Sequence, residues 1–338
     1  MASSLAGVVG ALVDRTPTAS RDRLVAELVP PPLFTGVRFD SYRPDPDRPS
    51  QSAALATLRG FADRLGQPPP RRRLLRKTTP PPGAGVYLDG GFGVGKTHLL
   101  ASLWHAVPPP AAYVTFVELT HLVGALGFAA TVEALAPFRL LAIDEFELDD
   151  PGDTVLVSTL LSRLTERGVA VAATSNTVPE ALGEGRFAAE DFRREIQRLA
   201  DRFETVRIDG ADYRHRGRRE PIAALTTADV VSRTDARPGA TRDDFAQLMA
   251  HLTALHPSRY AALVDAVSLV GLTDVQPVPD EAAALRLVVL VDRLYDRQIP
   301  VVASGLPLDE VFPAAMLAGG YRKKYLRSLS RLAALARL

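Results

Sequence analysis

The chain has 338 residues, of which 46% are hydrophobic, and its formal net charge is +1 at pH 7. This length and apolar content suffice for two hydrophobic cores, and the balanced charge creates no global field toward nucleic acid or anionic lipid. Cysteine is absent, which excludes disulfides and cysteine-based metal sites, and the six histidines show no spacing typical of metal ligands. No apolar run approaches the roughly 18 residues that a membrane span requires. We therefore expect a cytoplasmic protein with no membrane span.

Four elements are predicted before the first sequence motif. Residues 1–33 predict an N-terminal helical extension, and residues 34–42 an extended segment with aromatic side chains. A helix is expected from Ser50 to Leu65, with Ser50 as its N-cap. Residues 67–82 are linker-like and rich in arginine, which is typical of a solvated loop; contact with an acidic partner or nucleic acid is the alternative.

A glycine-rich loop follows the apolar run 86–88 and fits the pattern G-x-x-x-x-G-K-[ST]. Such a loop, between a strand and a helix, places backbone N–H groups around the β- and γ-phosphates of a nucleotide. Lys96 can reach the phosphate oxygens, and the Thr97 hydroxyl can ligate Mg²⁺. The pattern predicts ATP or GTP binding. The expected binding residues are Gly90, Gly91, Phe92, Gly93, Val94, Gly95, Lys96, Thr97 and His98.

Two adjacent carboxylates end the next strongly apolar run, residues 138–143. The pattern indicates a Walker B strand, whose carboxyl end lies at the nucleotide-binding edge of a parallel sheet. We expect Asp144 to hold Mg²⁺ and Glu145 to be the general base that polarises the attacking water.

A further buried-strand pattern, residues 169–173, ends in three polar residues, 174–176. Many P-loop ATPases have a polar side chain at this place that aligns water against the γ-phosphate. We assign this role to Asn176. The alternative is a strand that ends in turn-forming residues before Pro179.

Strand and helix patterns alternate from residue 85 to residue 208, which predicts an α/β fold. We expect a three-layer αβα sandwich of the P-loop NTPase class, with a five-stranded parallel sheet in the order 5-1-4-3-2. No guanine-reading N-K-x-D motif occurs in the sequence, which favours ATP over GTP. The predicted strands are residues 86–88, 112–116, 140–144, 169–174 and 204–208, and a helix is expected at 188–200 before the last strand.

The predicted domain organisation is a nucleotide-binding domain at 34–215, a linker at 216–240 and a mostly helical C-terminal lid domain at 241–338. Apolar residues recur at helical spacing in the lid, with a single strand candidate at residues 300–303. Arg327 is the lid residue that we expect to contact the nucleotide, and Arg331 is the alternative.

Several short segments resemble the ZapE family of AAA+ ATPases, from about Phe34 to Leu332. The D-Y-R and S-R-L elements are more specific than the nucleotide-binding motifs. The resemblance implies an AAA+ fold, Mg-dependent ATP hydrolysis and action on protein partners such as FtsZ, since the family includes a bacterial cell-division protein and a mitochondrial relative linked to protein quality control. The segments are residues 143–146, 168–176, 209–214, 294–296, 300–305 and 327–332.

The aromatic segment also resembles the one that initiator and loader AAA+ proteins place over the base. Phe39 and Tyr42 could therefore stack on adenine, and packing in the core is an equally good interpretation of both rings.

The sequence departs from the family where an arginine finger would be expected. The arginine that the family carries three residues before Phe192 is Ala189 here. Arg202 is our first candidate because its surroundings resemble a segment of replication initiators. Since a finger acts across subunits, we also expect an ATP-dependent homo-oligomer. The other candidates are Arg193, Arg194 and, more weakly, Arg186.

Two functions remain open from the sequence. The favoured one is an ATPase that remodels or regulates protein partners in cell division, at the FtsZ ring, or in protein quality control. The alternative is an ATP-switched protein that contacts nucleic acid in the manner of helicase loaders, supported by the arginine-rich segments 71–77 and 214–219.

Overall fold

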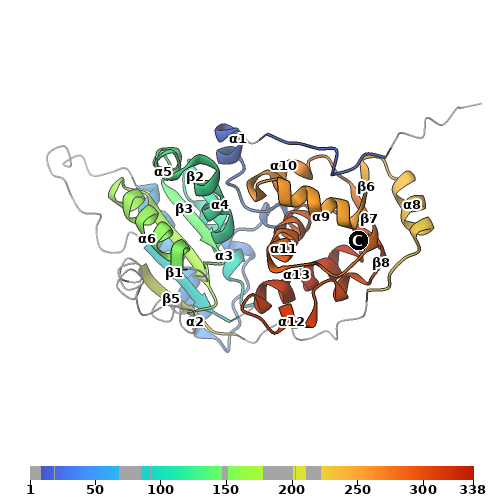
Figure 1. Ribbon diagram of the computed structural model, residues 1–338. Helices are drawn as coiled ribbons and strands as arrows, with labels where there is room; N and C mark the ends of the chain where they lie inside the picture. The colour runs from blue at the N-terminus through green and yellow to red at the C-terminus, as the bar shows by residue number, and fades with distance from the viewer. Residues whose placement is uncertain are drawn as a thin grey trace, which may run out of the picture. The chain divides into compact units, whose positions relative to one another are not determined.

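The computed structural model forms two compact units, one of residues 21–218 and one of residues 1–20 together with 219–338. Figure 1 shows the course of the chain through both units. Each unit is described by itself. The structure describes residues 9–18, 20–67, 85–91, 93–146, 151–177, 201, 203–210 and 222–338.

The first unit, called here the nucleotide unit, contains a five-stranded parallel sheet in the order β2-β3-β4-β1-β5. Read from the other edge, this is the predicted order 5-1-4-3-2, which is confirmed. Every residue of β1, β3 and β4 is buried, as expected of a parallel sheet that is covered on both faces. The strands are β1 (Gly85–Gly90), β2 (Ala111–Thr115), β3 (Leu140–Asp144), β4 (Ala170–Ser175) and β5 (Phe203–Ile208).

Helices lie on the two faces of this sheet. Alternate strand residues form one hydrophobic core with α2 and α3, while α4 contacts β2 and α6 contacts β4. The helix α4 begins with a capping box, in which the Thr115 side chain accepts from the Glu118 N–H at 3.2 Å. The helices are α1 (Arg21–Ala26), α2 (Pro49–Gly66), α3 (Lys96–Ala106), α4 (Phe116–Leu126), α5 (Phe128–Leu135) and α6 (Pro151–Glu166), with 3-10 turns η1 (Pro32–Phe34) and η2 (Phe39–Ser41).

Three details of this unit differ from the sequence predictions. The segment 34–42 is not extended throughout, because residues 39–41 form the 3-10 turn η2. Ser50 is not the N-cap of α2; Arg48 holds that position, and the Ser50 hydroxyl accepts from the Asp209 N–H at 2.9 Å instead. The sequence analysis also did not predict α5, which starts after Gly127, where a φ of 81° ends α4. The helix predicted at 188–200 lies outside the described residues.

The second unit, called here the C-terminal unit, is built around a three-stranded parallel sheet in the order β6-β7-β8. The prediction of one strand near residues 300–303 was therefore incomplete, and part of the predicted linker 216–240 forms α8. The strands are β6 (Ala240–Asp244), β7 (Leu269–Val275) and β8 (Val301–Gly305). The helices are α8 (Thr227–Asp235), α9 (Phe245–Ala254), α10 (Tyr260–Leu263), α11 (Glu281–Asp296), α12 (Ala314–Leu317) and α13 (Arg322–Leu335), with 3-10 turns η5 (Pro257–Arg259) and η6 (Leu308–Glu310).

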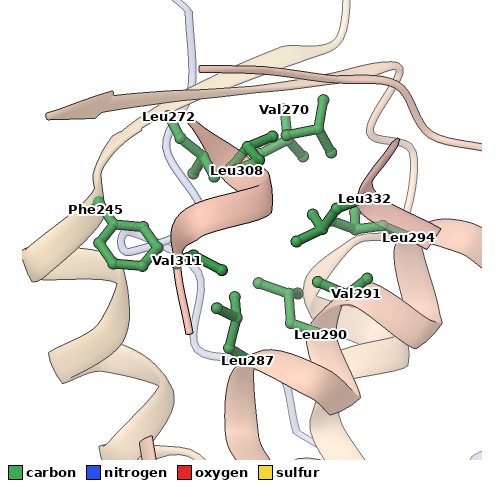
Figure 2. A pocket seen from close by; sticks show the side chains of 11 residues that line it. Phe245, Val270, Leu272, Leu287, Leu290, Val291, Leu294, Leu308, Val311 and Leu332 are labelled. Carbon is green, nitrogen blue, oxygen red and sulfur yellow. The ribbon is translucent and has the colours of Figure 1, made fainter. Parts of the chain in front are cut away.

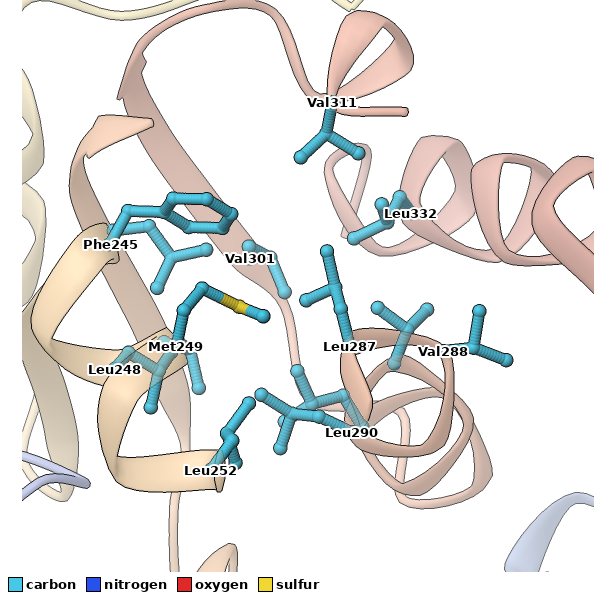
Figure 3. Close-up of a cluster of buried hydrophobic side chains, with 14 of the residues drawn as sticks. Phe245, Leu248, Met249, Leu252, Leu287, Val288, Leu290, Val301, Val311 and Leu332 are labelled. Carbon is cyan, nitrogen blue, oxygen red and sulfur yellow. The ribbon is translucent and has the colours of Figure 1, made fainter. Parts of the chain in front are cut away.

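The core of the C-terminal unit is closely packed. The core contains a cavity of about 10 Å³ whose lining is entirely apolar. Figure 2 shows the side chains that line it, among them Leu287, Leu290 and Leu332. A void of this size and lining is a packing defect that stays dry rather than a ligand site. Figure 3 shows the Phe245 and Met249 side chains of α9 facing α11, and these contacts hold the two helices against the sheet.

No single helix of the described residues is long and apolar enough to cross a membrane. Taken together, α4 and α5 have the length and composition of a span, but the two helices are bent by 119° at the break between them.

Candidate nucleotide-binding site

The glycine-rich loop connects the end of β1 to the start of α3, and its first and last glycines lie where a side chain would clash. Gly95 has a φ of 90°, and a Cβ at this position would lie 2.6 Å from a ring carbon of Tyr42. A Cβ at Gly90 would lie 2.3 Å from the carbonyl oxygen of Ile208. Larger residues at either position would therefore displace the loop.

Lys96 brings the loop and the end of β4 together. Its ammonium group donates to the carbonyl oxygens of Gly90 at 2.7 Å and Gly91 at 2.6 Å, and to Asn176 Oδ1 at 2.9 Å. The side chain is buried, so water screens its positive charge less and the charge acts more strongly on groups at the loop. The structure thus places Asn176 beside the lysine that would bind phosphate.

Asp144, the last residue of β3, accepts hydrogen bonds from groups on three other segments. Oδ1 accepts from the Thr97 hydroxyl at 3.3 Å, from the Glu145 N–H at 3.1 Å and from the Thr174 hydroxyl. Oδ2 accepts from the Tyr113 hydroxyl at 2.9 Å. The carboxylate is therefore fixed in orientation toward the glycine-rich loop.

Glu145 adopts a backbone conformation that is uncommon for a residue with a side chain. Its φ is 55°, in the left-handed region. Thr174 supports this conformation, since its hydroxyl accepts from the Glu145 N–H at 3.0 Å and its carbonyl accepts from the Phe146 N–H at 2.6 Å. The end of β4 therefore sets the direction in which the Glu145 side chain leaves the backbone.

Burial and neighbouring charges shift the pKa values of Asp144 and of Tyr113 beside it. Burial and then the charge of Glu145 raise the pKa of Asp144, and hydrogen bonds from three hydroxyl groups oppose this rise. Burial, together with the Asp144 carboxylate, raises the pKa of the Tyr113 phenol well above its ordinary value. Tyr113 therefore stays protonated and acts as a donor to Asp144.

The donor set around Asp144 suits a small hard cation. The described residues contain no group of three or more His, Cys, Asp or Glu that could form a metal cage of their own. Mg²⁺ is commonly held by one or two protein oxygens together with substrate phosphates. The Thr97 hydroxyl and the Asp144 carboxylate, which lie 3.3 Å apart, fit that pattern.

The aromatic residues 39 and 42 lie against the loop and the core. The Tyr42 hydroxyl donates to the Val94 carbonyl at 3.0 Å, and its ring lies 5.7 Å from that of His98. His98 also hydrogen-bonds the Ser41 hydroxyl at 2.9 Å. Phe39 is buried in the core, and the Arg59 guanidinium lies 5.8 Å from its ring centre. Both rings thus have packing roles, and stacking on adenine stays a prediction.

Arg327 lies in the C-terminal unit, on α13. Its Nη2 donates to Asp292 Oδ2 at 3.2 Å, and Arg331 pairs with the same carboxylate. Burial alone would raise the pKa of Asp292, but the two guanidinium groups outweigh it and hold that pKa below its ordinary value. Both candidate lid arginines therefore share one acidic partner. Phe92 and the finger candidates Arg186, Arg193, Arg194 and Arg202 lie outside the described residues.

Sequence reasoning missed three residues that organise the site. Thr174 and Tyr113 hold Asp144 from the two neighbouring strands. Gln51 accepts from the Asp45 N–H at 2.8 Å and donates to the Asp209 carbonyl at 2.9 Å, which ties the start of α2 to the end of β5. The parallel-sheet prediction could have flagged Thr174, because it is the strand-end residue nearest in register to Asp144.

Comparison with known proteins agrees with this geometry. Residues 18–237 and 218–337 match the AFG1-like ATPase family. Cell division protein ZapE of Escherichia coli (strain K12) is 26% identical over 293 residues, which cover 73% of this chain and 76% of that protein. An uncharacterized protein of Schizosaccharomyces pombe is 28% identical over 148 residues, covering 38% of this chain and 33% of that protein. The resemblance to the ZapE family is confirmed.

Solved structures of replication proteins are more distant. The replication initiator DnaA bound to AMPPCP and single-stranded DNA is 14% identical with a TM-score of 0.40, covering 53% of this chain and 51% of that chain. The DnaC helicase loader is 18% identical with a TM-score of 0.36, covering 52% of this chain and 99% of that chain. Both TM-scores are below 0.5, so nothing is inferred from these two likenesses.

Proposed function

This chain belongs to the AFG1-like ATPase family, and on that premise we propose that it hydrolyses Mg·ATP to remodel or regulate a protein partner in cell division. One observation supports the chemistry above all. The ammonium of Lys96, the amide of Asn176 and the Asp144–Glu145 pair meet at the carboxyl edge of one parallel sheet. These are the groups that phosphoryl transfer to water requires.

Each side chain has a distinct task in this proposal. Lys96 exchanges its carbonyl partners for oxygens of the β- and γ-phosphates, and the loop N–H groups at the start of α3 bind the same phosphates. Asn176 orients the attacking water near the γ-phosphate. Glu145 accepts a proton from that water, and Thr174 keeps its backbone in the conformation that directs the carboxylate there.

Thr97 and Asp144 would hold Mg²⁺. When bound, the cation neutralises charge on the phosphate oxygens. Asp144 is held on both oxygens by hydroxyl groups and a backbone N–H, so its position is set by the protein before any cation arrives.

We propose that an arginine of a neighbouring subunit completes the site, and Arg202 is the first candidate. Arg202→Ala should hydrolyse ATP slowly on its own. Mixing this protein with the separate Glu145→Gln variant, which retains Arg202, should restore turnover in mixed oligomers, because an arginine finger can contribute about three orders of magnitude in rate. If Arg193→Ala or Arg194→Ala is rescued and Arg202→Ala is not, the arginine finger is Arg193 or Arg194 instead of Arg202. No rescue of any variant, in a chain that stays monomeric with ATP, would exclude this assembly.

The proposed partner is FtsZ, as the resemblance to the ZapE family implies. Glu145→Gln with ATP should co-sediment with FtsZ polymers more strongly than wild type, because the nucleotide is not cleared. The double variant Lys96→Ala/Glu145→Gln is the matched control and should not respond to ATP. No co-sedimentation in either state, together with tight and salt-sensitive DNA binding, would replace this proposal by the loader-like alternative. The arginine-rich segments behind that alternative lie outside the described residues.

A further inference from the structure

The N-terminal segment of the chain, residues 10–15, docks on the C-terminal unit. Gly10 forms a parallel bridge with Thr241 of β6, and its carbonyl accepts from the Arg242 N–H at 2.9 Å. β6 is an end strand of its three-stranded sheet, so the segment covers a strand edge that would otherwise present unpaired backbone groups. In Figure 1 this segment is the dark blue trace that passes β6.

A buried carboxylate receives the backbone of the segment. Asp243 is only 2% exposed, and its two oxygens accept from the N–H groups of Leu12 and Val13, each at 3.0 Å. These bonds recognise two consecutive backbone N–H groups rather than a particular side chain. A proline at either position of the segment would remove a donor.

Two side chains of the segment add anchors on either side of this carboxylate. Leu12 is fully buried in the hydrophobic core of the C-terminal unit. The guanidinium of Arg15 donates to the carbonyls of Leu263 at 3.0 Å and Asp265 at 2.8 Å, and the Arg15 carbonyl bonds to His251 at 2.9 Å. Together these contacts bind a short peptide that pairs with the sheet edge at Gly10 and then turns, since the Arg15 N–H donates to the Leu12 carbonyl at 3.0 Å.

The part of the chain that matches the family includes the β6 edge but not the segment that docks on it. The family match begins at residue 18, after the docked segment, and it includes β6 and Asp243. The receiving edge thus belongs to the region that defines the family, and the segment that fills it lies outside. Residues 16–20 then lead from the docked segment to α1, which belongs to the nucleotide unit.

We propose that the β6 edge, with Asp243 and the apolar socket of Leu12, is a binding site for a short peptide that turns at the carboxylate, and that residues 10–15 are its built-in ligand. The ligand class is a peptide turn that begins at an aliphatic residue, has N–H groups available at that residue and the next, and carries an arginine three positions after the aliphatic residue.

The experiment uses the full chain and a fluorescein-labelled synthetic peptide of residues 9–18. The full-length variant Leu12→Asp cannot bury its own segment and should bind the peptide, as measured by fluorescence anisotropy. Wild type should bind about tenfold or more weakly, because a tethered segment has an effective concentration on the order of millimolar. A peptide carrying Val13→Pro is the matched control and should not bind. Asp243→Asn, added to Leu12→Asp, should weaken binding of the unmodified peptide several-fold.

Three results would overturn the proposal. They are equal binding to wild type and Leu12→Asp, equal binding of the Val13→Pro peptide, and no binding by a variant that circular dichroism shows to be folded. If Leu12→Asp does not fold, the full-length variants Val13→Pro and Arg15→Ala replace it. Failure of all three to fold would show that the segment is an integral part of the core, and that result also counts against a peptide site.

Discussion

Each of the two parallel sheets of this protein has a pair of adjacent acidic residues at the end of one strand, and the two pairs have different surroundings. Asp144 is the last residue of β3 and Glu145 follows it, whereas Asp243 and Asp244 are the last two residues of β6. Burial raises the pKa of both Asp144 and Asp243. Around Asp144 the donors are mainly hydroxyl groups beside a glycine-rich loop, whereas Asp243 accepts backbone N–H groups of the chain's own N-terminal segment. An acidic strand end therefore becomes a candidate catalytic site only where a phosphate-binding loop faces it.

The largest expected effect separates the second members of the two pairs. Glu145→Gln should bind Mg·ATP normally and hydrolyse it at least about 100-fold more slowly, the usual scale for loss of a positioned general base. Asp244→Asn is the matched control, because Asp244 caps α9 through the Gln247 N–H at 2.9 Å and asparagine caps equally well. Steady-state ATPase assays would measure both. Wild-type turnover by Glu145→Gln would show that another group is the base.

The next effect tests the loop that distinguishes the two sheets. Lys96→Ala should lower ATP affinity by about ten- to a hundredfold, since a buried charged donor to phosphate is lost. Titration with a fluorescent ATP analogue measures this, and Arg163→Ala on the exposed face of α6 is the control for loss of a positive charge. Unchanged ATP affinity in the Lys96 variant would show that the glycine-rich loop is not the nucleotide-binding site.

A smaller effect distinguishes the two hydroxyl groups that hold Asp144. Thr174→Val removes both the donor to Asp144 and the acceptor of the Glu145 N–H, whereas Tyr113→Phe removes only a donor to Asp144. We expect kcat to fall by about tenfold in Thr174→Val and less in Tyr113→Phe, given the cost of an unsatisfied buried polar group. Binding of the ATP analogue should require more Mg²⁺ in both variants.

Thr174→Ser keeps the hydroxyl and should restore both kcat and the Mg²⁺ requirement. Thr165→Val is the control for loss of a buried threonine hydroxyl, because that hydroxyl donates to the Leu161 and Ser162 carbonyls of α6. Equal effects of Thr174→Val and Tyr113→Phe on kcat would show that Thr174 does not position Glu145.

The smallest expected effect is on the free energy of unfolding, which should depend on pH through the Asp243 carboxylate. Burial raises its pKa above the ordinary 3.8, and the charge of Asp14 adds to the rise, while the Leu12 and Val13 N–H groups and His251 oppose it. Because the folded state then binds the proton more tightly, this group's contribution to the free energy of unfolding is full below pH 3.8 and declines as pH rises through the raised pKa.

Asp243→Asn lacks this titration. The difference in unfolding free energy between wild type and Asp243→Asn should therefore shrink from about pH 4 toward pH 7 in denaturant titrations. A difference that grows with pH would contradict the raised pKa.

Local sequence patterns predicted most strands of the nucleotide unit and its main motifs. The glycine-rich loop and the buried runs of β3 and β4 are set by residues that are neighbours in the chain. The sheet order, and the placement of Lys96, Asp144 and Asn176 at one edge, followed from the class of P-loop ATPase that these motifs indicate. Tyr113 was missed because it is not level in register with Asp144, and nothing in its own strand shows that its hydroxyl will face that carboxylate. Thr174 could have been found once the predicted strands were aligned in a parallel register.

The tertiary structure decided the rest, where the determining contacts are distant in sequence. β6 reads Ala-Thr-Arg-Asp-Asp, which has no strand pattern of its own, and it is a strand because β7 pairs with one edge and Gly10 with the other. Leu12 and Asp243 are 231 positions apart, so their contact leaves no periodicity in the sequence. The partner of Ser50 was decided in the same way, since Asp209 reaches it only when β5 joins the sheet. Local patterns specify a segment's type, whereas long-range pairing specifies which polar groups meet.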